Sequence, residues 1–238
     1  MFFKSKTIIT FTNLHEYPEL SAPQPASKVI PTWYKETTNW YPESKNQTPE
    51  SYPTIKKCMP VFDSMTAGYI LNTPADVFVS DKLGEPYYET SVPKIIEHHP
   101  LKQGHKHPNQ NSFSFPKWIN GWGIKTPKGY SCLFLPPMHN SNIWFECLPG
   151  IVDTDTYTAG VNFPFVLKNP SFQGLIPAGT PMIQVIPFKR DEWKFVRGQS
   201  NDLEEAKNVN TELSVRFFNR YKNLYWTKKN WSITDFDK

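Results

Sequence analysis

Short runs of hydrophobic and β-branched residues, separated by turn-forming residues, fill the middle of the chain. Such runs, bounded by Pro, Gly, Asn and Asp, are typical of β-strands. They predict strands at 67–71, 76–80, 118–125, 130–135, 160–166 and 182–188, with turns at 126–129 and 176–179. No helical period of useful length interrupts them. Residues 61–197 are therefore predicted to form a mainly β body, built as a closed or double sheet.

The first sixty residues have a different pattern. A strand-like run at 7–12 leads into a stretch rich in Pro, Trp and Tyr. Because proline fixes φ and lacks an N–H, residues 1–60 are predicted to form an extended arm on the body, without regular helix or central strands. A proline-rich ligand segment for another protein is the alternative.

Residues 198–238 predict one helix followed by a tail. Asn201 can cap the helix, with Glu204 at the reciprocal position of a capping box. The helix carries an apolar stripe for the body or for a neighbouring subunit, formed by Leu213, Phe217, Tyr221 and Leu224.

Composition narrows the class of protein. Aromatic residues make up 15% of the chain, too many for a disordered protein, and 23 prolines are too many for a mainly helical one. No apolar run approaches the roughly 18 residues of a membrane span, and the first residues turn polar too soon for a signal peptide. Three widely spaced cysteines without a CxxC motif favour a reducing, cytoplasmic compartment. A net charge of +4 without a basic run gives no strong nucleic-acid signal.

Four segments of the body resemble the motifs of the dUTPase and dCTP deaminase superfamily, in that family's order. Residues 66–71 (TAGYIL) are similar to its first motif, and 126–136 to the strand and turn that lead into its phosphate motif. Residues 149–157 (PGIVDTDTY) resemble the third motif, and 176–185 the fourth. The resemblance covers residues 66–188. It implies a dUTPase-like β-clip or jelly-roll-like barrel and a homo-oligomer, a trimer in that family.

The same resemblance implies a binding site that has lost its hydrolytic residues. Asp153 takes the position of the family's water-holding Asp, and Tyr157 is nearest to the Tyr that stacks on deoxyribose. Gln184 matches a site-closing Gln, although in an alternating strand it is expected on the solvent face. Ile70 replaces an Asp that helps to hold Mg²⁺, and residues 137–140 (PMHN) replace the phosphate-gripping Arg-Ser-Ser. The candidate residues for a small anionic ligand or nucleotide are then Tyr157, Gln184, His139 and Asn140.

Segments across nearly the whole chain are also similar to a family of tailed-phage proteins, cyanophages especially, without a settled activity. They are residues 31–34, 54–60, 67–70, 125–131, 152–155 and 186–193. This resemblance implies a viral origin, with the protein in the cytoplasm of an infected bacterium or in the virion.

Histidines and aspartates supply the remaining candidate chemistry. His105 and His107 form a His-x-His pair whose rings would share one side of a strand, and His139 could complete a cupin-like site for Fe or Zn. A polar surface loop is the alternative. Asp153 and Asp155 are the candidate catalytic residues: on a strand, their like charges would raise one pKa and suit a general base or a metal ligand. In a turn, they would instead cap backbone N–H groups.

Three functions follow from the sequence. The first is a ligand-binding or assembly protein on a dUTPase-like scaffold that does not hydrolyse triphosphates. The second is a three-His metalloenzyme, for example an oxygenase, and the third is a virion component whose aromatic arms hold neighbouring subunits. Whether the chain is an enzyme stays open, since a diverged nucleotide hydrolase or deaminase would retain the same scaffold.

Overall fold

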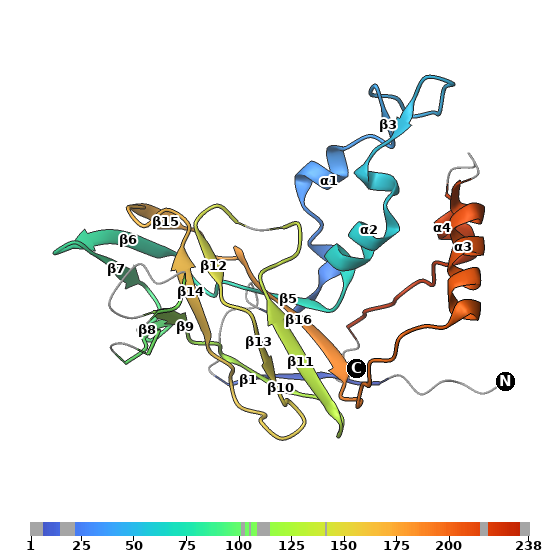
Figure 1. Ribbon diagram of the computed structural model, residues 1–238. Helices are drawn as coiled ribbons and strands as arrows, with labels where there is room; N and C mark the ends of the chain where they lie inside the picture. The colour runs from blue at the N-terminus through green and yellow to red at the C-terminus, as the bar shows by residue number, and fades with distance from the viewer. Residues whose placement is uncertain are drawn as a thin grey trace.

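The computed structural model describes residues 7–14, 22–100, 103–104, 106–108, 115–140, 142–214 and 219–233. Over these residues the protein is mainly β, and every strand pairing is antiparallel (Figure 1). The largest sheet has the strand order β13 (Gly150–Val152), β11 (Tyr130–Leu135), β16 (Pro181–Lys189), β5 (Tyr69–Asn72) and β2 (Gln24–Pro25).

Smaller sheets cover the rest of the described body. One has the order β12 (Phe145–Cys147), β14 (Phe163–Leu167), β9 (Pro116–Trp118) and β8 (Ile96–His98). A second has the order β15 (Gly174–Ile176), β6 (Val77–Lys82) and β7 (Glu85–Thr90). Two strand pairs join β1 (Thr10–Asn13) to β10 (Trp122–Lys125), and β3 (Trp40–Tyr41) to β4 (Tyr52–Pro53). Within the described residues no sheet closes on itself, so the expected barrel is not what this part of the chain forms.

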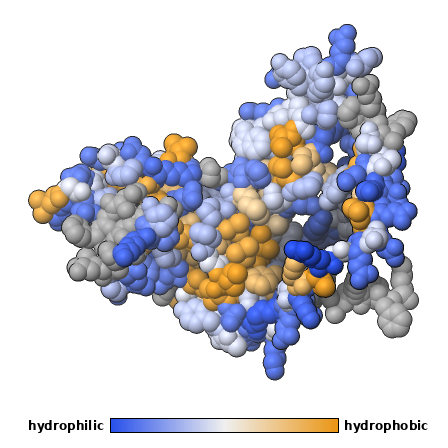
Figure 2. All heavy atoms as spheres, in the orientation of Figure 1, coloured by the Kyte–Doolittle hydropathy of each residue, from blue (hydrophilic) through white to orange (hydrophobic). Residues whose placement is uncertain are grey.

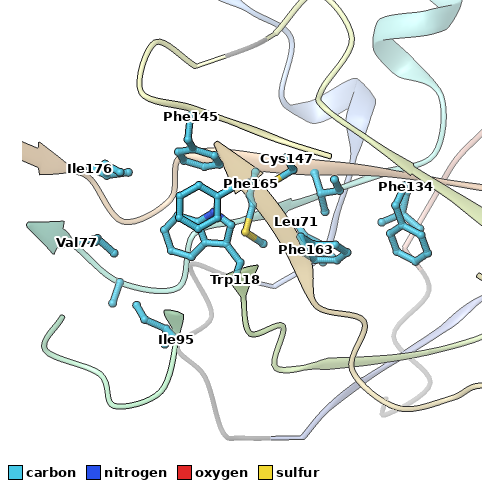
Figure 3. Packing of buried hydrophobic residues seen from close by; sticks show 14 of the residues in the cluster. Leu71, Val77, Ile95, Trp118, Phe134, Phe145, Cys147, Phe163, Phe165 and Ile176 are labelled. Carbon is cyan, nitrogen blue, oxygen red and sulfur yellow. The ribbon is translucent and has the colours of Figure 1, made fainter. Parts of the chain in front are cut away.

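Aromatic rings form the centre of the hydrophobic core. Trp118 of β9 stacks on Phe165 of β14 with ring centroids 5.1 Å apart, and Phe145 of β12 packs against both rings (Figure 3). All three side chains are buried because they are the inward-facing members of alternating strands. Rings packed at these distances add to the stabilisation that burial alone provides.

The predicted run at 118–125 forms two strands because of one side chain. The Asn120 amide donates to the Trp122 carbonyl at 2.8 Å and accepts from the Trp122 N–H at 3.1 Å. These bonds hold a bend between β9 and β10, which then pair with different neighbours. By contrast, β11 has the bounds expected from its pattern, 130–135.

The arm contains helix that its proline content argued against. Two short 3₁₀ helices span Ala26–Lys28 and Ile55–Lys57, and α1 spans Thr32–Glu36. Helix α2, Met59–Thr66, follows them, with Pro60 in its first turn. Proline is tolerated there because the N–H groups of a first turn have no partner within the helix.

The C-terminal region forms two described helices and not one. They are α3 (Ser200–Ser214) and α4 (Arg220–Leu224), which stand together beside the body (Figure 1). The Asp202 carboxylate accepts from the Gln199 N–H at 2.6 Å, so the reciprocal capping contact falls two residues before the expected pair. Of the predicted apolar stripe, Phe217 lies outside the described residues.

Candidate functional site

The two candidate catalytic aspartates lie in a turn that follows β13. Their shared neighbour Thr154 is fully buried, and its hydroxyl lies 2.8 Å from the Thr126 hydroxyl and 3.3 Å from the Cys132 sulfur. The Asp153 carbonyl accepts from the Tyr157 N–H at 2.9 Å, which closes the turn. Burial of Thr154 directs both flanking carboxylates to the same side.

Arg190, just after β16, binds both carboxylates. Its Nη1 lies 3.0 Å from Asp153 Oδ1 and 2.9 Å from Asp155 Oδ1, and its Nη2 donates to Asp155 Oδ2. Ser131 Oγ donates to Asp153 Oδ1 at 2.7 Å, and the Gly129 N–H donates to Asp155 Oδ2 at 2.8 Å. The Asp155 side chain is only 3% exposed, so its hydrogen bonds come from the Arg190 guanidinium and the Gly129 N–H.

These contacts lower the pKa of both aspartates. Hydrogen bonds from Arg190 and from the Gly129 N–H bring the pKa of Asp155 from 3.8 to about 2. The pKa of Asp153 is lowered chiefly by the Ser131 hydroxyl, with Arg190 adding to the effect. The raised pKa expected for a like-charged pair on a strand is therefore wrong, because a cation lies between the two groups. The cluster fastens the turn to β11 and β16, and its carboxylates are poor proton acceptors near neutral pH.

Gln184 is fully buried, not on the solvent face expected for it. Its Oε1 accepts from the Met138 N–H at 2.9 Å, and its Nε2 donates to the carbonyls of Ser64 at 2.9 Å and Ala67 at 2.7 Å. Those two carbonyls belong to the last turn of α2 and to its C-cap, where helices leave acceptors without partners. The amide is thus occupied in joining β16 to the end of α2.

Two of the other ligand candidates, His139 and Asn140, hold the arm in place through polar contacts. The backbone carbonyl of His139 accepts from Trp33 Nε1 at 2.9 Å, and Asn140 Nδ2 donates to the Val29 carbonyl at 2.8 Å. Tyr157 is about half exposed, and its hydroxyl reaches the Gly160 carbonyl at 3.5 Å. Within the described part of the chain these three side chains make their contacts at separate places.

The two described histidines of the proposed metal site, His107 and His139, lie in different surroundings. His107 packs edge-on against Phe115 and, with His99, lines a pocket of about 510 Å³. His139 lies in the turn that contacts the arm, and His105 lies outside the described residues. Across the described chain, no three His, Cys, Asp or Glu side chains group as metal ligands would.

A second pocket, of about 370 Å³, lies beside the β6–β7 hairpin, and the sequence pattern did not point to it. Its walls come from β6, β7, β9, β14 and the loop after β14. Four aromatic side chains line it, contributed by Tyr88, Phe115, Phe165 and Phe172. Sequence reasoning also missed Arg190, which entered it only as part of the net charge of +4. The signal that could have found it is the Asp-x-Asp turn, whose two negative charges have no Lys or Arg nearby in the sequence.

Comparison with known protein families and with curated proteins finds no match to this sequence. No helix in the described chain is both long and apolar enough to cross a membrane.

Proposed function

We propose that the chain is a non-hydrolytic assembly or ligand-binding protein that works as a homo-oligomer, on a dUTPase-like scaffold of phage type. The observation that carries the proposal is a long segment that its own chain leaves almost fully exposed, although α3 stands beside α4. From 191 to 214 every residue except Val209 is exposed, and α3 buries none of its fifteen residues.

Large apolar side chains are exposed in that segment. Trp193 is 91% exposed and Phe195 is 88% exposed, in a stretch without regular structure between β16 and α3. We call residues 191–199 the strap. Single exposed apolar residues are ordinary on protein surfaces, but two nearly bare rings two positions apart are not. A helix of this length is also marginally stable in water without tertiary contacts.

The chain is fixed to the body just before the strap and again after α4. Arg190 holds one end through the aspartate turn. At the other end Trp226 Nε1 donates to the Asp63 carboxylate at 2.9 and 3.0 Å, and Lys229 pairs with the same group at 2.6 Å. The strap and α3 are therefore presented at a defined place, as a surface for a partner requires.

A second copy of the chain is the partner that we propose, because the body offers a matching apolar surface. Leu133 of β11 is the cross-strand partner of both Ile151 and Ile186, so the three side chains form one row. Ile151 is mostly exposed and the other two are half-buried. Figure 2 shows a hydrophobic patch over these strands. We call Leu133, Ile151 and Ile186 the apolar row.

The area fits a stable self-association. Two aromatic side chains bury roughly 150–250 Å² each, or about 300–500 Å² for Trp193 and Phe195 together. A standard interface buries roughly 800 Å² on each partner, so the strap and one face of α3 would supply most of it. In a closed ring or a two-fold dimer every copy gives one strap and receives another.

The absence of triphosphate hydrolysis has separate support. Asp153 and Asp155 are both paired with Arg190, and Gln184 has its hydrogen bonds filled by the backbone. Ile70 is 2% exposed in β5, between Gln24 and Gln184, where an aliphatic side chain offers no ligand for Mg²⁺.

Sedimentation velocity tests the assembly. We expect the wild type to sediment as an oligomer of the 27.6 kDa chain, a trimer if the superfamily's assembly holds. The double substitution Trp193→Ser with Phe195→Ser, and separately Ile151→Lys, should give monomers with unchanged circular dichroism. Leu83→Ser, at an exposed hairpin tip, is the matched control and should leave the oligomer intact.

A wild type that stays monomeric at tens of micromolar would refute the assembly, as would strap variants that sediment like the wild type. Hydrolysis is tested separately by incubation with a panel of deoxynucleoside triphosphates and Mg²⁺. Release of pyrophosphate or ammonia above background, lost in Asp153→Asn, would show a nucleotide enzyme instead.

A further inference from the structure

The pocket beside the β6–β7 hairpin has aromatic walls. Tyr88 packs edge-on against Phe165 with ring centroids 5.6 Å apart, and Phe165 is itself fixed by stacking on Trp118. Phe172, from the loop after β14, is only partly buried. The volume, about 370 Å³, lies within the usual range of small-molecule sites, roughly 300–1,000 Å³. The walls are therefore rigid on one side and accessible on the other.

The charge at this pocket is negative. Asp81 and Glu85 line it from the two strands of the hairpin, and the described lining includes no Lys, Arg or His. Lys82, in the same hairpin, places its ammonium over the Tyr87 ring, 4.7 Å from the centroid. Lys82 is also the cross-strand partner of Glu85, and it does not line the pocket. The Lys82 ammonium is held over the Tyr87 ring, so Asp81 and Glu85 are the charged side chains of the described lining.

Glu85 affects the neighbouring phenol of Tyr88. Burial and, after it, the charge of Glu85 raise the pKa of Tyr88 above its ordinary value. The Tyr88 phenol is neutral at physiological pH, and its ring has a negative face that attracts cations. Glu85 is partly buried, so water screens it less than an open surface charge.

We infer that this pocket binds a small organic cation, one that carries a substituted ammonium group on an apolar body. Aromatic faces attract such cations through the ring quadrupole, and the attraction strengthens when water is excluded. Asp81 and Glu85 supply the opposite charge at the hairpin. The whole chain has a net charge of +4, which repels cations in general, so saturable cation binding must come from a local site. The inference does not depend on the proposed assembly.

Isothermal titration calorimetry with three probes of similar size tests the charge preference. The probes are benzyltrimethylammonium, benzyl alcohol and benzenesulfonate, at pH 8 and low salt. The ring centroid of His98 lies 6.0 Å from that of Tyr88. Burial lowers the pKa of His98, so its ring is neutral at pH 8. We expect saturable binding of the cation, about tenfold weaker binding of the alcohol and none of the anion.

Two variants locate the site. Glu85→Gln should weaken cation binding about fivefold, as expected for one partly screened ion contact. Glu89→Gln is the matched control: it removes the same charge from an exposed position of β7 that does not line the pocket. Phe172→Ala should weaken binding about tenfold through loss of an aromatic wall, with the melting temperature nearly unchanged.

Three results would overturn the inference. The first is no saturable binding of benzyltrimethylammonium at millimolar concentration. The second is equal binding of the sulfonate, which would mean an apolar site without charge preference. The third is an equal loss in Glu85→Gln and Glu89→Gln, which would mean that the cation responds only to overall charge.

Discussion

Replacing Gln184 with Met separates a structural role from a ligand-binding role. Methionine has nearly the same length and fits the space, but it can neither donate two hydrogen bonds nor accept as an amide does. Three backbone groups would lose their partner: the Met138 N–H and the carbonyls of Ser64 and Ala67. Because the Gln184 side chain is 0% exposed, water cannot replace the amide without a rearrangement.

The size of the effect follows from that count. Each buried polar group left without a partner costs roughly 1–3 kcal/mol. Partial relaxation of the α2 terminus should reduce the sum, so we expect Gln184→Met to lower the free energy of unfolding by about 3–5 kcal/mol. Single-domain stabilities are about 5–15 kcal/mol, so this is a large fraction of the total.

Urea unfolding followed by tryptophan fluorescence measures this loss. With a slope of roughly 2–3 kcal/mol/M, the midpoint should fall by about 1–2.5 M. Gln47→Met, at an exposed position, is the control and should shift the midpoint by less than about 0.3 M. A Gln184→Met variant as stable as this control would refute the capping role and return Gln184 to the candidate ligand residues.

Two other predictions concern acid stability and thiol reactivity. The folded-state pKa of Asp155 lies below its unfolded value of 3.8, so its contribution to stability is present above about pH 4 and is lost as the pH falls toward 2. Arg190→Met should lower the melting temperature at pH 7. The difference in melting temperature between this variant and the wild type should shrink as the pH falls to 2, and a difference that stays constant over that range would contradict the prediction. In the native protein only Cys58 should react with a thiol reagent, one thiol per chain and three after denaturation. The other two thiols are buried, and burial raises the pKa of each: Cys132, to about 11, and Cys147.

Local patterns predicted local structure well. Strand β11 is a run of buried and half-buried residues between a turn-forming TPKG and two prolines, and its bounds are those expected. The sequence did not predict helix α2, which crosses the expected boundary at residue 60 between the arm and the β body, although a first-turn proline such as Pro60 is compatible with a helix. The Ala-Gly-Tyr segment after it was assigned wholly to a strand. In the structure Gly68 has φ +68° and ends the helix, and a Cβ there would lie 2.0 Å from the Val185 carbonyl oxygen.

Partners distant in sequence could not be predicted. Arg190 is 35 residues from Asp155, and Gln184 is 120 residues from Ser64. Both contacts depend on strand register, which one sequence does not specify without knowledge of which strands pair. The β6–β7 pocket depends in the same way on a hairpin facing β14 and the loop that follows it.

The arrangement of the resembling segments bears on what the resemblance means. Residues 66–71, 126–136, 149–157 and 176–185 contribute β5, β11, β13 and the start of β16, which are neighbours in one sheet. In that sheet Ile70 packs in the interior, Gln184 caps a helix and both aspartates bind an arginine. Each similar position therefore has a structural reason for its residue that needs no nucleotide. A sequence pattern of this kind can arise on these grounds alone, so the resemblance by itself does not imply a common reaction.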